Sequence, residues 1–157
     1  MYGNTQTKYY PLGDVCYDDI LGALEGARRY IFIEYFIIEE GKLWNSVLEI
    51  LARKAAQGVE VRVIYDDVGS ILTLPANYPA KLEKMGIHCR VFNRLVPLLP
   101  LRQHNRDHRK YMIIDGPVAF PGRINMDDEY NHVSAPLGHW HHPPPPLGRP
   151  ASASRAR

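Results

Sequence analysis

The chain has 157 residues, which is enough for one domain with a modest core. Its formal net charge of +2 gives no sign of a nucleic-acid-binding surface, so we expect no nucleic-acid partner. No apolar run reaches the roughly 18 residues that span a bilayer, and we expect neither a membrane-spanning helix nor a secretory leader. Cys16 and Cys89 lack metal-ligand spacing, and we expect both to be free, reduced thiols.

The first predicted elements are a helix and a buried strand. Asp14 can cap a helix whose apolar residues keep to one face, namely Ile20, Leu21, Leu24 and Ala27. Residues 30–38 are mostly β-branched and aromatic, which predicts a strand buried on both faces. Glu34 interrupts this run, and a buried carboxylate is costly unless it is paired. Both a structural salt bridge and a role near a functional site are open for Glu34.

A second helix and two further strands follow. Residues 43–57 form an amphipathic pattern that Gly58 ends, and residues 59–65 form a strand pattern. Asp66 and Asp67 come at the end of that strand, where they either cap the next turn or line a cleft and bind a cation. A short helix over 79–85 and a strand over 87–92 complete an alternation of strands and helices. This order predicts an α/β fold with helices packed over a sheet.

Residues 94–102 are apolar but contain Pro97 and Pro100, which exclude a regular helix or central strand. One interpretation is a loop that packs back on the core. The other is an apolar lip among lipid tails, with Arg94 and Arg102 meeting anionic headgroups.

The most informative stretch contains His108, Lys110 and Asp115 at the spacing H-x-K-x4-D. Residues 110–114 predict a strand ended by a turn at 115–116, and residues two apart on a strand share a face. A neutral imidazole can attack phosphorus, an ammonium can hold a phosphate oxygen, and a carboxylate can orient the pair. The alternative is a basic, solvated loop that leads into an edge strand.

Gly122 and Asn125 follow at further fixed offsets, and with them the stretch resembles the H-x-K-x4-D-x6-G-[GS]-x-N signature of the phospholipase D superfamily. The amino-acid sequence of residues 105–110, 124–125 and 128–130 is similar to the first such motif of bacterial cardiolipin synthases. The resemblance covers residues 6–131 and includes the segments 9–13, 33–36 and 55–63. It implies a phospholipase D-like mixed β-sheet flanked by helices, which is one half of the usual two-lobed enzyme.

The resemblance also implies a chemistry. Two such motifs build one site: one histidine attacks the phosphodiester and becomes a phosphohistidine, and the other protonates the leaving alcohol. By this likeness His108, Lys110 and Asp115 are catalytic, Gly122 and Asn125 bind the substrate phosphate, and Glu129 is a further orienting carboxylate. No metal or other cofactor is expected. The chain departs from the family pattern at residue 123, where Arg123 replaces a small residue.

Residues 132–157 lie beyond the resemblance and contain four consecutive prolines, so we expect a domain over 1–131 and a disordered tail. A shift of reading frame near residue 131 would explain the change in character. The absence of the membrane-spanning helices that usually precede the catalytic part in such synthases suggests that the chain is a fragment or starts late.

A second H-x-K-x4-D motif is absent from the sequence, and three hypotheses follow. The chain is the amino-terminal half of a synthase that converts phosphatidylglycerol to cardiolipin and glycerol; or it is a homodimeric single-motif phosphodiesterase; or it is a non-catalytic remnant that binds anionic lipid. The expected partners are anionic phospholipid, a membrane surface, and either a second copy or the missing carboxyl-terminal half. The expected location is the cytoplasmic face of the bacterial cell membrane.

Overall fold

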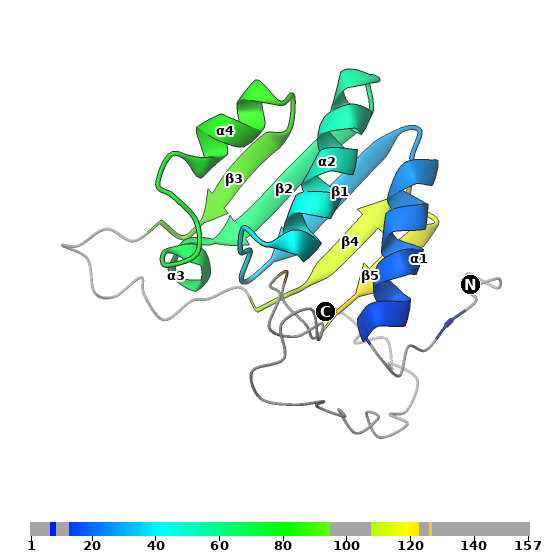
Figure 1. Cartoon of the computed structure of the whole chain (residues 1–157), viewed down its shortest axis with the longest axis horizontal. Coiled ribbons are helices and arrows are strands. Elements are labelled where there is room, and N and C mark those ends of the chain that lie inside the picture. The colour runs from blue at the N-terminus through cyan, green and yellow to red at the C-terminus, as the bar shows by residue number, and fades with distance from the viewer. Residues whose placement is uncertain (1–6, 9–12, 95–107, 123–125, 127–157) are drawn as a thin grey trace, which may run out of the picture.

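A computed structural model describes residues 7–8, 13–94, 108–122 and 126, and shows a sheet with helices packed against it (Figure 1). The helices are α1 (Gly13–Gly26), α2 (Lys42–Ala56), α3 (Asp67–Ser70) and α4 (Tyr78–Lys84). The strands are β1 (Tyr30–Tyr35), β2 (Glu60–Asp66), β3 (His88–Phe92), β4 (Tyr111–Ile114) and β5 (Val118–Pro121). Asp14 lies among the side chains that are not described, as do the predicted lip and the predicted tail.

The described strands form a mixed sheet in the order β3-β2-β1-β4-β5. The first three run parallel, and β4 and β5 form an antiparallel hairpin against β1. This confirms the predicted mixed α/β sheet flanked by helices. The parallel arrangement brings the carboxyl ends of β1, β2 and β3 to one edge, and the antiparallel β4 begins at that same edge.

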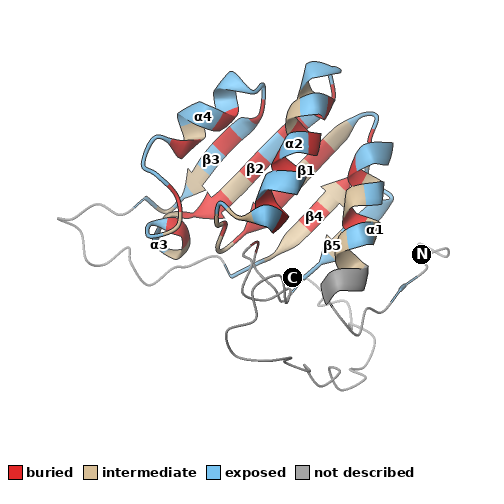
Figure 2. Ribbon diagram, in the orientation of Figure 1, coloured by how far each residue is buried: buried red, intermediate tan, exposed pale blue. Residues whose placement is uncertain are grey.

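The core lies between the sheet and the helices α1, α2 and α4, which cover one face (Figure 2). Ile31, Ile33 and Tyr35 of β1 point into it and are buried, whereas Tyr30 and Phe32 are only half-buried. The predicted burial on both faces is therefore only partly correct, because Glu34 is buried on the second face whereas Tyr30 and Phe32 are not. The predicted length is wrong. The strand ends at Tyr35 because the chain then bends to pack on α3. Cys16 and Cys89 are free thiols, as predicted.

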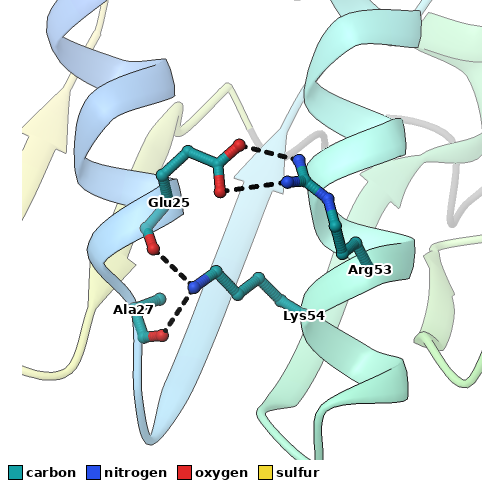
Figure 3. A network of polar contacts seen from close by, with 4 residues as sticks. All are labelled: Glu25, Ala27, Arg53 and Lys54. Carbon is teal, nitrogen blue, oxygen red and sulfur yellow. Dashed lines mark hydrogen bonds and ion pairs between the residues drawn. The ribbon is translucent and has the colours of Figure 1, made fainter.

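A polar network joins the carboxyl end of α1 to α2 (Figure 3). The buried Lys54 ammonium donates to the carbonyl oxygens of Glu25 and, at 3.1 Å, of Ala27. The neighbouring Arg53 forms a two-pronged ion pair with the Glu25 carboxylate at 2.7 and 3.3 Å. Cations suit the carboxyl end of a helix because its last carbonyls have no partner within the helix. None of the helices that the structure describes is long and apolar enough to cross a membrane.

Lys54→Met is expected to lower the free energy of unfolding by about 1–3 kcal/mol, because it leaves two carbonyls without their donor in a buried place. Arg53→Met is the matched control, since the Arg53 and Glu25 side chains are 47% and 46% exposed. An exposed ion pair of this kind contributes about 0–1 kcal/mol. Urea unfolding of the two variants measures the difference, and equal midpoints would contradict the assignment.

Candidate active site

The candidate site lies at the edge where β1 ends and β4 begins. The imidazole of His108, which is exposed, stacks on the ring of Phe36 with 4.2 Å between the centroids and 28° between the planes. The Lys110 ammonium lies 5.7 Å from the centroid of the same ring and donates to the His108 carbonyl oxygen at 3.0 Å. The structure therefore brings the imidazole and the ammonium to one ring, as their spacing predicts.

The side chains of Arg109 and Tyr111 turn the other way, toward Glu34. The Arg109 guanidinium lies 3.2 Å from one carboxylate oxygen of Glu34, and the Tyr111 hydroxyl donates to the other. Glu34 is buried, so these partners compensate its loss of hydration. Side chains alternate along an extended chain, and anchoring 109 and 111 on Glu34 leaves 108 and 110 to face Phe36. Glu34 thus forms a structural salt bridge that also orients His108 and Lys110.

Gly122 lies beside this pair. It follows β5, is exposed, and its N–H donates to the Lys110 carbonyl oxygen at 2.8 Å. Met126 pairs with residues just beyond Phe36: its N–H donates to the Ile37 carbonyl at 3.1 Å. Asn125, Glu129 and Arg123 lie outside the described residues, so their predicted roles stay predictions.

Asp115 does not belong to this group, and its predicted role as a carboxylate that orients the pair is corrected. It lies at the far end of β4, seven residues from His108, a path of roughly 20 Å along an extended chain. Its carboxylate accepts hydrogen bonds from the backbone N–H groups of Arg28, Arg29 and Tyr30 at 2.8, 2.7 and 2.9 Å. Asp115 therefore ties the hairpin turn to the start of β1.

The same donors stabilise the charged form of the carboxylate. The N–H groups of Tyr30 and then Arg28 are the main causes that hold the pKa of the Asp115 carboxyl below its usual value. A lowered folded-state pKa means that the stabilisation is present above the unfolded pKa of about 3.9. It is lost as the pH falls through the folded-state value.

Asp115→Asn is accordingly expected to lower the urea midpoint at neutral pH. The difference in midpoint between the variant and the parent chain should narrow as the pH falls below about 4, where the carboxyl of the unfolded parent chain takes up a proton. It should be smallest below the folded-state pKa, where both states of the parent are neutral at this residue. Asp18→Asn, at an exposed position of α1, is the control and should leave the midpoint unchanged. A gap that does not depend on pH would contradict a charge-dependent role for Asp115.

Two features of this edge were missed in the sequence. Phe36 was only one member of an apolar run, and no local signal marks it as the platform for His108. α3 was predicted only as a turn, although Asp66 does cap it: one carboxylate oxygen accepts from the N–H groups of Val68 and Gly69 at 3.0 and 3.1 Å. The capping interpretation of Asp66 is therefore confirmed.

α3 packs tightly on Phe36. A Cβ atom at Gly69 would lie 2.2 Å from the Phe36 carbonyl oxygen, so only glycine fits there. The Ser70 hydroxyl accepts from the Ile38 N–H at 3.2 Å and lies 3.5 Å from the Phe36 carbonyl oxygen. The ring under His108 is thus supported from the end of β2.

Comparisons with known proteins bear on the family and the fold of the chain. The family described as cardiolipin synthase, PLD-like domain, matches residues 20–134. A cardiolipin synthase of Staphylococcus aureus is 37% identical over 133 residues, which is 85% of this chain and 27% of the relative. An uncharacterized protein of Streptococcus mutans is 42% identical over 140 residues, 89% of this chain and 30% of the relative. The chain thus spans less than a third of the length of these curated relatives.

Two solved structures share the fold. Nuc, a phospholipase D family member from Salmonella typhimurium, superposes with a TM-score of 0.55 at 19% identity, over 74% of this chain and 68% of its own. NucT from Helicobacter pylori gives 0.54 at 16% identity, over 72% and 68%. Together with the family match and the relatives at 37% identity or more, they lead to one conclusion. The chain belongs to the cardiolipin synthase, PLD-like domain family of the phospholipase D superfamily.

Proposed function

We propose that this chain supplies one half of a phosphatidyltransferase site that forms cardiolipin and glycerol from two molecules of phosphatidylglycerol. The observation that carries the proposal is that the His108 imidazole and the Lys110 ammonium lie on one ring, where β1 ends and β4 begins. The proposed reaction class is supported by a relative named cardiolipin synthase that matches 85% of this chain. The proposal includes a peripheral position on the cytoplasmic face of the cell membrane.

The His108 nitrogen attacks the phosphorus of one phosphatidylglycerol. The phosphorus–oxygen bond to the glycerol headgroup breaks, and the leaving oxygen takes a proton from the histidine of a second motif. The resulting phosphohistidine is attacked by a headgroup hydroxyl of a second phosphatidylglycerol, which returns its proton to that second histidine. The phosphorus–nitrogen bond breaks and cardiolipin leaves. Lys110 holds a phosphate oxygen while charge develops on it.

One chain contains only one such histidine–lysine pair, so the other histidine comes from elsewhere. In the favoured arrangement it comes from the carboxyl-terminal part of a longer protein, because the relatives are more than three times as long as the matched region. The second candidate is a homodimer in which two copies complete the site. It is favoured by the single motif. A lipid-binding remnant without catalysis is the third.

The three arrangements give different results in one experiment. The chain is incubated with phosphatidylglycerol vesicles, alone and with a separately produced carboxyl-terminal half of the S. aureus relative, and cardiolipin is measured by mass spectrometry. Cardiolipin formed only with the added half supports the favoured arrangement. Turnover by the chain alone, together with a dimer in size-exclusion chromatography, supports the homodimer. No product under either condition overturns the proposed transferase.

A further inference from the structure

Three apolar side chains beside the candidate site point into solvent. Val68 and Ile71 are 38% and 48% exposed, and Leu72 is 96% exposed. They belong to α3 and the turn that follows it, with the spacing i, i+3 and i+4 that places residues on one side of a helical turn. We call these three residues the α3 tip. Large apolar side chains that are exposed next to one another are typical of interaction surfaces.

The α3 tip is held firmly from below. Asp66 caps the helix, and the Ser70 hydroxyl bonds the Ile38 N–H. The Thr73 hydroxyl donates to the Ile38 carbonyl at 2.6 Å, and Leu74 is buried in the core. The three apolar side chains are therefore held on a fixed support. They point into solvent although the residues on both sides of them are anchored to the rest of the domain.

The tip lies at the same edge as the candidate site. α3 follows β2 directly where the parallel strands end (Figure 1), and Gly69 contacts Phe36, on which the His108 imidazole stacks. Cations accompany it: Lys110 lies on the Phe36 ring, and the exposed Arg94 follows β3, which runs parallel to β2. Apolar side chains next to cations match an anionic bilayer, which offers acyl chains below a layer of phosphates.

The geometry points to the α3 tip as a membrane-docking surface, with Leu72 and Ile71 among the acyl chains and Lys110 and Arg94 at the headgroup phosphates of anionic lipid. This inference rests on the proposed function, because it supplies the lipid surface on which that site acts. It shares Arg94 with the predicted lip over 94–102, whose other residues lie outside the described part of the chain.

The size of the surface favours lipid over a second protein. The α3 tip contains three residues, far fewer than the roughly 20–30 residues per partner of a standard protein interface, which buries roughly 800 Å² on each side. A bilayer needs no such area, because a few inserted side chains and several cations together give reversible binding.

Leu72→Asp tests the inference, since a side chain that is 96% exposed can be changed without disturbing the core. Vesicles of phosphatidylglycerol and phosphatidylcholine are sedimented with the full chain. The variant should bind about tenfold more weakly or worse, because one buried leucine is lost. Val118→Asp is the matched control: Val118 is 40% exposed but begins β5 at the opposite edge of the sheet, and its variant should bind as the parent does.

Leu72→Trp measures directly how deeply residue 72 enters the bilayer. The change is made together with Trp140→Phe, so that Trp44, which is fully buried, is the one other tryptophan and gives a constant background. The fluorescence of residue 72 should shift to the blue with anionic vesicles and be quenched by brominated acyl chains. The inference is overturned if the parent chain does not bind these vesicles, or if Leu72→Asp and Val118→Asp bind equally well. A dimer that Leu72→Asp dissociates would overturn it too, in favour of a second copy.

Binding and reaction are measured separately, so the two proposals can fail separately. If the chain binds vesicles through the tip but no cardiolipin forms under any condition, the proposed transferase is wrong and the membrane-docking surface stands. If cardiolipin forms but Leu72→Asp binds vesicles as the parent chain does, the membrane-docking surface is wrong and the proposed transferase stands.

Discussion

His108→Ala is expected to lower the rate of phosphodiester exchange by at least about 10³-fold in the assembly that contains both motifs. The imidazole is exposed at the sheet edge and supported on one side by the Phe36 ring, so its free nitrogen can reach a phosphorus atom. Alanine leaves no nucleophile in its place. Lys110→Met should cost about 10²–10³-fold, because a single fixed cation on the phosphate is removed. Cardiolipin formation over time measures both.

His88→Ala is the matched control. His88 is also exposed, on β3, but it lies beside Glu83 with 3.5 Å between the His88 Nδ1 and a carboxylate oxygen, near the opposite end of the sheet from Phe36. Its loss should leave the rate unchanged. Turnover that survives His108→Ala would show that another group is the nucleophile. An equal loss in both variants would indicate a general effect on folding.

Gly69→Ala is expected to destabilise the domain by about 1–3 kcal/mol, the range for an overpacked position. The added Cβ would lie 2.2 Å from the Phe36 carbonyl oxygen and 3.0 Å from its carbonyl carbon. Both are backbone atoms, so no side-chain rotation can relieve the contact. Either α3 or the segment after β1 must shift, and the ring under His108 shifts with it. We therefore expect a lower urea midpoint and, in the active assembly, a lower rate.

Gly22→Ala provides the control within the same chain. A Cβ atom at Gly22, in α1, would meet nothing within 4 Å, and alanine in a helix interior is favoured over glycine by about 0.5–1 kcal/mol. The two glycine-to-alanine changes should thus move the midpoint in opposite directions. If Gly69→Ala were neutral, the tight contact between α3 and Phe36 would be wrong, and with it the support that we assign to the site.

The regular elements were predicted well where hydrophobic periodicity is strong. The bounds of α2, α4, β2 and β3 differ from the predicted ranges by at most one residue, because their apolar patterns extend over whole elements and end at turn residues. The strand over 30–38 was predicted too long. Its apolar run continues past Tyr35, but residues 36–38 pack around α3 and do not extend the strand. A run of apolar residues does not reveal which neighbouring element buries it.

The candidate site was predicted in part for a similar reason. The imidazole and the ammonium come together because they are two residues apart on an extended chain, which is a local relation. Asp115 belongs to the same sequence motif, yet it follows β4 and therefore lies at the opposite end of the strands from His108. There it meets the N–H groups of residues 28–30, more than eighty positions earlier in the chain. No spacing rule within the motif contains that contact.

The family, the α/β class and the pairing of His108 with Lys110 can be read from the residues alone, because each depends on residue types at short, fixed separations. Three other features come from long-range packing: Phe36 supports the imidazole, Glu34 turns Arg109 and Tyr111 away from it, and α3 presents an apolar tip beside the site. These contacts join the ends of different strands. Their geometry follows from strand order and from the point at which each strand ends, and both are set by packing of the whole domain.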